Sequence, residues 1–227
     1  AGSGLTDLAD AAPGRRAPPG RAGAEPGAVT AAPVVEGLPQ GEVEMILPLP
    51  DHGGPFTYAY DARCFFQAHR DLVVDLAARA VGPWEGELAC DLYAGVGLFS
   101  VPLSRRYARV LAVEGDAVSA RYARLNARRN RAPAVDVVLQ AVETWIGDLP
   151  EALDRLVVDP PRGGLSKRVR DVVLERPPAR LTYVSCHAAT LARDLRHLLA
   201  AYTLESLVLL DMFPQSGHME AVAQLAR

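Results

Sequence analysis

Apolar and polar residues follow two different periods along this chain. Residues 70–81 place their apolar side chains on one helical face, and Gly82-Pro83 ends the pattern, which predicts a helix. From residue 88 onward, short apolar and β-branched runs alternate with helical stretches. The predicted strands cover 88–94, 109–115, 135–141, 155–161 and 180–186. The helices between them begin after Gly97 and near residue 117, and two more are expected at about 143–153 and 166–175. This alternation predicts an α/β fold, with a mainly parallel sheet and helices on both faces.

The segments on either side of this alternation differ from it. Residues 1–40 are rich in Ala, Gly, Pro and Arg without a sustained period, which is typical of a linker or of the trimmed end of a larger protein. Residues 41–69 hold two short strand-like stretches around the turn-forming "DHGGP", which predicts a small β lead-in. The main domain is expected over 70–227, and its last two apolar stretches, 202–214 and 218–227, are expected to form a β pair that closes one edge.

Composition indicates a globular protein but does not show whether the chain binds RNA. The chain has 227 residues, of which 49% are hydrophobic, and a net charge of -3, so it can bury one sizeable core but gives no global preference for or against RNA. Its three cysteines lie far apart, which predicts reduced thiols in a cytoplasm and no metal site. No leader or long apolar run is visible, so neither secretion nor membrane insertion is expected, and the oligomeric state is left open.

Polar residues stand where the predicted strands end, which is where ligands bind in sheets of this type. In "DLYAGVGLFS" the turn through Gly95 and Gly97 allows backbone to approach a ligand closely, although such glycines also serve tight packing. Glu114 ends the next strand, about 20 residues on, where an acid can bind ribose hydroxyls; capping a helix is the alternative. A third glycine is missing from the loop, which favours S-adenosylmethionine over a dinucleotide.

The next strand end carries a carboxylate in a rigid setting. Asp159 passes directly into Pro160-Pro161, which hold the chain extended and remove two backbone donors. Such a fixed carboxylate is suited to orienting a ligand. The alternative, a cap for the helix that begins near Ser166, requires poor geometry because the two positions are too far apart.

Cys186 ends the following strand, and its neighbours suggest a use for a thiol there. C5 of a pyrimidine is a poor nucleophile until another nucleophile adds at C6, and a thiolate suits that step. A base must then remove the C5 proton, and Glu220, at the start of the last predicted strand, offers a carboxylate whose pKa burial would raise. On position alone, an inert buried cysteine would be the commoner explanation.

Five stretches of the chain together resemble the RNA 5-methyluridine methyltransferases. They are "CFFQAH", "DLYAGVGLFS", "VVDPPRGGL", "YVSCHAATLARDL" and "DMFPQSGHMEAV". The resemblance runs from about residue 55 to the C-terminus and implies a Rossmann-like, S-adenosylmethionine-dependent enzyme that methylates uridine C5 in transfer or ribosomal RNA. It implies that Cys186 is the nucleophile and Glu220 the base, with Gln67, Tyr93, Glu114 and Asp159 lining the pocket for cofactor and target base.

The sequence departs from this family's pattern at a few positions. His187-Ala188 stand where the family usually has Asn-Pro after the cysteine, and His69 stands where it usually has Asn. A histidine beside Cys186 could favour the thiolate or serve only structure. The family's N-terminal RNA-binding barrel and iron–sulfur cysteines are not recognisable.

Arginine and lysine residues form two groups that could contact RNA phosphates, although charged runs are more often solvated helix faces. The groups are Arg121, Arg124, Arg128, Arg129 and Arg131, and Arg162, Lys167, Arg168 and Arg170. Two alternative functions stay open: a catalytically impaired RNA-binding homologue, and a methyltransferase that acts on an exocyclic nitrogen or a small molecule with Cys186 idle.

Overall fold

The computed structural model describes residues 41–67, 69–212, 214–216 and 219–227, all within one compact unit, Leu38–Arg227. The segment 1–40, predicted to be irregular, lies outside the described residues. The division of the rest into a β lead-in and a main domain at residue 70 stays a prediction.

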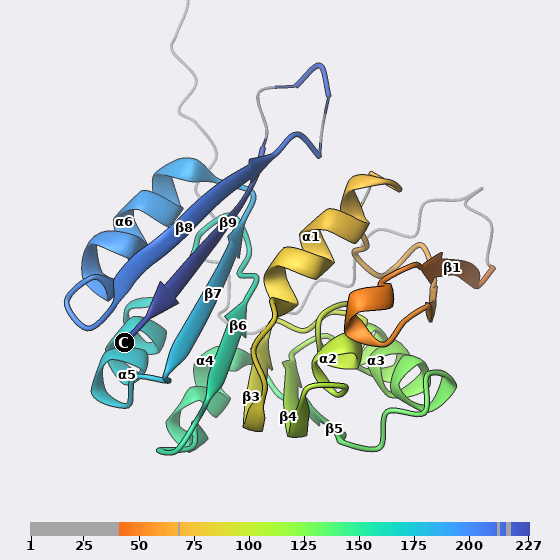
Figure 1. Cartoon of the computed structure of the whole chain (residues 1–227), viewed down its shortest axis with the longest axis horizontal. Helices are drawn as coiled ribbons and strands as arrows, with labels where there is room; N and C mark the ends of the chain where they lie inside the picture. The colour runs from red at the N-terminus through yellow and green to blue at the C-terminus, as the bar shows by residue number, and fades with distance from the viewer. Residues whose placement is uncertain (1–40, 68, 213, 217–218) are drawn as a thin grey trace, which may run out of the picture. The chain divides into compact units, whose positions relative to one another are not determined.

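A seven-stranded sheet forms the centre of this unit (Figure 1). Its strands, in spatial order, are β5 (Val135–Leu139), β4 (Tyr107–Glu114), β3 (Gly86–Leu92), β6 (Arg155–Val158), β7 (Arg180–Ser185), β9 (Glu220–Ala226) and β8 (Thr203–Leu210). The five strands from β5 to β7 are parallel, and β9 is antiparallel to both of its neighbours. The predicted mainly parallel sheet is confirmed, and the final β pair is present with β9 placed inside the sheet.

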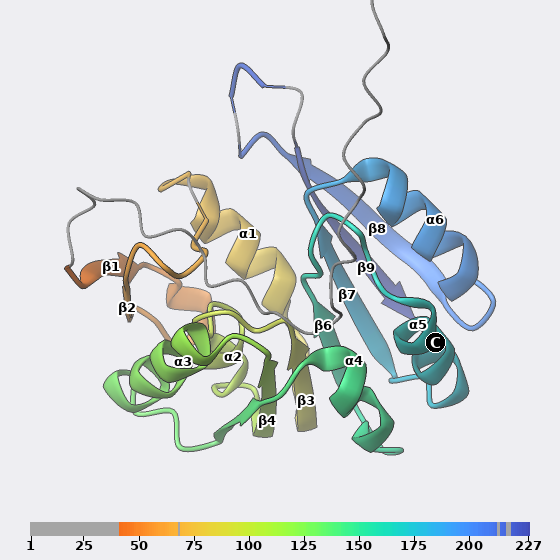
Figure 2. The same cartoon turned by 180° about the vertical axis from the view of Figure 1, so that it is seen from behind.

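Helices cover both faces of the sheet, as predicted (Figures 1 and 2). Residues of α1 (Leu72–Val81), α2 (Ser100–Leu103) and α3 (Ala117–Arg129) share one apolar cluster with one face. Residues of α4 (Val142–Trp145), α5 (Lys167–Glu175) and α6 (Ala188–Leu198) share a second cluster with the other face. Successive side chains of β6 point to opposite faces of the sheet. Val157 packs on the side of α1, and Leu156 and Val158 pack on the side of α4.

One predicted helix is much shorter in the structure. The stretch 143–153 was expected to be helical, but α4 ends at Trp145 and continues only as a 3-10 turn, Ile146–Asp148. Leu149 then adopts an extended backbone with φ -56° and ψ 123°. It precedes Pro150, and the residue before a proline is disfavoured in the helical region, which explains the early stop.

The small β lead-in is present as an antiparallel pair, β1 (Val43–Leu47) and β2 (Phe56–Tyr60), joined through a 3-10 turn, Pro50–His52. Two asparagines, one in α3 and one at its C-cap, bind this pair. Asn126 accepts a hydrogen bond from the Ala59 amide at 2.7 Å, and Asn130 accepts one from the Thr57 amide at 2.8 Å. The chain leaves β2 toward Gln67 and the start of α1, so the lead-in fixes where Gln67 enters the main domain.

The strand order reverses at the centre of the sheet. The chain runs from β3 outward to β4 and β5, then returns to β6 on the other side of β3. A reversal of this kind opens a crevice at the carboxyl ends of the two central strands. Here that crevice lies beside Asp91 of β3 and Asp159, the first residue after β6.

Candidate functional site

Strand alternation brings four polar side chains to one edge and one face of the sheet. On β3, Asp91 follows Ala89 in the alternation toward the α1 side. Continued by one residue past β6 and β7, the same alternation directs Asp159 and Cys186 to that side. Glu220, the first residue of β9, shares a face with Val222, which also packs on the α1 side.

Cys186 and Glu220 lie opposite each other across the pair formed by β7 and β9. The last paired residues of this ladder are Ser185 and Ala221, so the next opposed positions are Cys186 and Glu220. Directly opposed residues of an antiparallel pair have side chains on the same face within contact range. The sequence placed both residues at strand ends, and the structure adds that these two ends meet.

The electrostatic environment couples the thiol to the two carboxyls. Burial raises the pKa of Cys186, and the charges of Glu220 and Asp159 raise it further, whereas the guanidinium of Arg162 lowers it. Burial, with a smaller effect from Asp159, raises the pKa of Glu220 to about 8. Burial alone raises the pKa of Asp159 to about 7. Both carboxyls can therefore hold or release a proton near neutral pH, which is what general acid–base work requires.

The loop after β3 has an open side and a packed side. Gly95 has φ +54°, and a Cβ placed on it would meet no atom within 4 Å, so the space beside it is free. Gly97 has φ +88°, and a Cβ placed on it would lie 3.6 Å from Ala123. The loop therefore packs closely against α3 at this position. The packing explanation therefore fits Gly97, whereas Gly95 leaves room for a ligand.

Glu114 is held in place by backbone amides at both oxygens. Its Oε2 accepts from the Gly95 amide at 2.7 Å, and its Oε1 accepts from the Asp116 amide at 2.7 Å. Asp116, not Glu114, caps α3, because its Oδ1 accepts from the Ser119 amide. The helix-capping alternative for Glu114 is therefore not what the structure shows.

Asp91 belongs to this site, although the sequence analysis assigned it no role. It is fully buried, its Oδ2 accepts from the Ser100 hydroxyl at 2.5 Å, and its Oδ1 has no hydrogen-bond partner. Burial raises its pKa to about 7 against the opposing effect of Ser100, and Asp159 and Glu114 raise it further. The only sequence clue was its place at the end of a strand, directly before the glycine loop.

The two remaining predicted side chains are those of Tyr93 and Gln67. Tyr93 has the left-handed φ of 62°, and its hydroxyl donates to Glu143 of α4 at 2.8 Å. Gln67 is only 7% exposed, and its Oε1 has no partner. No hydrogen bond joins Gln67 to the other predicted site residues within the part of the chain that the structure describes.

The model of the tRNA (uracil-5-)-methyltransferase family matches residues 38–227. The chain belongs to this family. The resemblance inferred from the five sequence stretches is thereby confirmed.

Individual relatives of the uracil-5-methyltransferase family agree. An uncharacterised RNA methyltransferase of Thermosynechococcus vestitus is 41% identical over 166 residues, covering 71% of this chain and 37% of that protein. A 23S rRNA (uracil(1939)-C(5))-methyltransferase of Pectobacterium atrosepticum is 36% identical over 180 residues, covering 76% and 40%. The crystal structure of Pyrococcus abyssi tRNA (uracil-54, C5)-methyltransferase in complex with S-adenosyl-L-homocysteine matches with a TM-score of 0.70 at 29% identity, covering 82% and 44%. The chain thus spans less than half the length of these relatives.

Both histidines that depart from the uracil-5-methyltransferase pattern accept a backbone hydrogen bond at the start of a helix. His187 is the N-cap of α6, and its Nδ1 accepts from the Thr190 amide at 3.3 Å. His69 Nδ1 accepts from the Leu72 amide at 3.2 Å at the start of α1. An asparagine caps helices in the same way, because it too offers a short side-chain acceptor. The structural explanation for His187 is therefore the one that its contacts support.

Several of the cations offered for phosphate contacts are engaged within the chain. Arg129 pairs with Glu42 and Glu44, and Arg170 pairs with Asp194. Of the second group, Arg162 makes no side-chain hydrogen bond to another described residue, and its charge acts on Cys186. The Arg162 guanidinium is thus without a hydrogen-bond partner among the described residues, whereas those of Arg170 and Arg129 are engaged.

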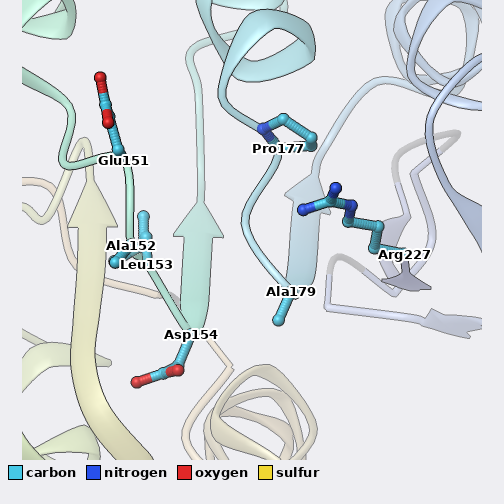
Figure 3. Close-up of a pocket in the computed structure, with 7 residues that line it drawn as sticks. All are labelled: Glu151, Ala152, Leu153, Asp154, Pro177, Ala179 and Arg227. Carbon is cyan, nitrogen blue, oxygen red and sulfur yellow. The ribbon is translucent and has the colours of Figure 1, made fainter.

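A surface cavity lies at the opposite end of the sheet. It has a volume of about 530 Å³ and is lined by residues that include Asp154 and Ala179. Figure 3 shows these two residues just before the starts of neighbouring strands, β6 and β7. None of the predicted site residues lines this cavity.

No described helix has both the length and the apolar composition that crossing a bilayer requires.

Proposed function

We propose that this chain is the catalytic part of an enzyme that transfers a methyl group from S-adenosylmethionine to C5 of uridine in RNA, through a covalent bond between Cys186 and C6. The observation that carries the proposal is the opposition of Cys186 and Glu220 beside Asp159 at the carboxyl edge of the sheet. Family membership supports the reaction class.

The chain's own residues fit S-adenosylmethionine. Glu114 presents a fixed carboxylate for ribose hydroxyls, and the open side of Gly95 admits a ligand against backbone. Two buried acceptors without partners, Asp91 Oδ1 and Gln67 Oε1, are satisfied if a ligand donates to them. The Pyrococcus abyssi relative is described in complex with S-adenosyl-L-homocysteine, the demethylated product of this cofactor. When bound, the cofactor supplies a methyl group activated by a positively charged sulfur.

The residues of the chain divide the reaction between them. The Cys186 thiol gives its proton to solvent water, and the thiolate sulfur forms a bond to C6 of the uracil ring, which moves electron density onto C5 and makes that carbon nucleophilic. After C5 has taken the methyl group, Glu220 removes the C5 proton. The released electron pair restores the C5–C6 double bond and breaks the bond from C6 to the Cys186 sulfur.

Asp159 and Arg162 act on the target base and on the thiol before the bond between Cys186 and C6 forms. Asp159, with a pKa of about 7, can accept or donate a hydrogen bond at the polar edge of the pyrimidine and so orient it. Arg162 opposes the two carboxyls that raise the pKa of the thiol. The target base must leave its stack to reach Cys186, as in other enzymes that act on a base.

We propose transfer or ribosomal RNA as the substrate class. The named relatives act on 23S rRNA and on tRNA, and the chain spans less than half of their length, so RNA contacts outside this chain are part of the proposal. A soluble cytoplasmic setting, with no metal, remains our expectation for the enzyme.

Methyl transfer by two cysteine variants tests the proposal. Cys186→Ala is expected to abolish methylation of unmodified tRNA and 23S rRNA transcripts, tested separately, while Cys64→Ala, which removes the other partly exposed thiol, keeps it. Binding of S-adenosyl-L-homocysteine by Cys186→Ala should match that of the wild type. Activity retained in Cys186→Ala would instead support transfer to an exocyclic nitrogen.

A further inference from the structure

We propose that Asp194 of α6 is a positioning residue: it fixes the loop of Asp159 and Arg162 to the helix that begins directly after Cys186. This inference rests on the proposed function, because positioning matters only if the thiol and the loop act together. Asp194 itself is fully buried and is not among the residues that face the crevice.

The Asp194 carboxylate accepts hydrogen bonds from four donors in four parts of the chain. Its Oδ2 accepts from the Leu165 amide at 2.8 Å and from the Tyr183 hydroxyl at 2.7 Å. Its Oδ1 accepts from Arg170 at 2.9 Å and from Nε of Arg193 at 2.9 Å, and it forms an ion pair with Nη2 of Arg193 at 2.8 Å. The carboxylate thereby joins α5, β7 and the end of the loop to α6.

The loop from Asp159 to Leu165 is shaped around this carboxylate. Gly164 has φ +71°, and a Cβ built on it would lie 2.5 Å from Asp194 Oδ2, so only glycine allows this approach. Arg193, held by Asp194, donates to the Gly163 and Leu165 carbonyls at 2.9 and 3.2 Å. One turn earlier on α6, the Thr190 hydroxyl donates to the Arg162 carbonyl at 3.1 Å.

The same helix sets the position of the thiol. Cys186 precedes the α6 cap, His187, and the helix begins at Ala188. Cys186 is thus attached to α6 through the chain, and the loop that carries Asp159 is attached to α6 through Asp194. Without the carboxylate, two guanidinium groups would lose their shared partner, and the loop would lose its backbone contact at Leu165.

Asp194→Asn tests the positioning role, because it replaces the carboxylate by an amide of nearly the same size. The amide keeps one acceptor oxygen but places an NH₂ group against donors, so the loop is expected to move away from α6. A displacement of about 1 Å at the reacting groups costs on the order of 10²-fold in rate. We therefore expect the single-turnover rate of methyl transfer at saturating RNA to fall about 10²-fold. The KM for RNA and the Kd for S-adenosyl-L-homocysteine should stay near the wild-type values.

Leu195→Ala is the matched control, since it removes a neighbouring core side chain of α6 and leaves the loop contacts intact. It should lower the melting temperature at least as much as Asp194→Asn and keep the single-turnover rate of its folded fraction. If both variants keep the wild-type rate, or if both lose it equally, Asp194 is only structural and the inference is overturned.

Arg193→Gln covers the case in which Asp194→Asn does not fold. Its side chain is partly exposed, and the substitution removes the Nη2 contacts with the Gly163 and Leu165 carbonyls. We expect a smaller loss of rate, about 10-fold, again without a change in KM. A wild-type rate in Arg193→Gln would overturn the inference. If the wild-type chain itself transfers no methyl group, the proposed function fails, and the role of Asp194 fails with it. If the wild type is active and the variants match it, only the role of Asp194 is overturned.

Discussion

Cys186 and Glu220 occupy opposed positions one step beyond the last backbone pair of β7 and β9. This relationship exists because β9 runs antiparallel beside β7, so that its first residue meets the residue that follows the end of β7. The proposed nucleophile and the proposed base are thereby placed directly beside the end of a backbone ladder.

Replacing Glu220 by Gln should trap the reaction after methyl transfer. The amide cannot remove the C5 proton, so the bond between Cys186 and C6 stays closed, and a covalent complex with unmodified RNA should accumulate on a denaturing gel. Glu205→Gln, on the exposed edge strand β8, is the control and should release its product normally. Multiple turnovers by Glu220→Gln would show that another group acts as the base.

The stability of the chain should depend on pH through Glu220. Its pKa is about 8 in the folded chain and near 4.5 when unfolded, so between these values the folded state holds a proton that the unfolded state has lost. Its contribution is fully present below about pH 4.5 and is lost as the pH rises through about 8. The effect amounts to a few kcal/mol at most, since each unit of pKa shift corresponds to about 1.4 kcal/mol.

Glu220→Gln should remove this dependence, because its side chain does not titrate. Its melting temperature relative to the wild type should therefore rise between pH 5 and pH 9, whereas that of Glu205→Gln should not. A difference between Glu220→Gln and the wild type that is constant across this range would contradict the raised pKa of Glu220.

The two readings of His187 make different predictions. As the cap of α6 it can be replaced by Asn with little loss, whereas His187→Ala should cost about 1 kcal/mol of unfolding free energy, as lost caps do. Chemical denaturation measures this difference, and single-turnover methylation should be kept in His187→Asn. If the rate in His187→Asn falls as far as in Cys186→Ala, the histidine takes part in the chemistry.

Glu114→Ala should weaken cofactor binding. Loss of a charged acceptor costs about 1.5–3 kcal/mol, which corresponds to roughly 10-fold to 100-fold in the Kd for S-adenosyl-L-homocysteine. Isothermal titration measures it, with Glu151→Gln at the far end of the sheet as the control. An unchanged Kd in Glu114→Ala would remove this residue from the cofactor site.

The sequence predicted the parts of the site that depend on strand ends. Apolar runs predicted to within a few residues where β3, β4, β6 and β7 stop. In a parallel sheet these stops share one edge, so the sequence alone predicted that Glu114, Asp159 and Cys186 lie at the same edge. The position of β9 between β7 and β8 could not be read in this way, because apolar runs do not specify which strands pair.

Other features depend on three-dimensional contacts that no local pattern shows. Asp91 and Asp194 resemble ordinary aspartates in a strand and a helix, and only their burial and partners reveal their roles. The histidine caps were missed because helix N-caps are usually Ser, Thr, Asp or Asn. Arg170 and Arg129 looked free in the sequence, since their acidic partners are distant along the chain.

The most direct test of the covalent route is the intact mass of the protein after incubation with S-adenosylmethionine and 5-fluorouridine-substituted RNA. Fluorine at C5 cannot be removed as a proton, so the wild-type chain should gain the mass of the RNA together with one methyl group, and Cys186→Ala should gain nothing. A wild-type protein of unchanged mass, under conditions in which it methylates ordinary RNA, would contradict the bond between Cys186 and C6.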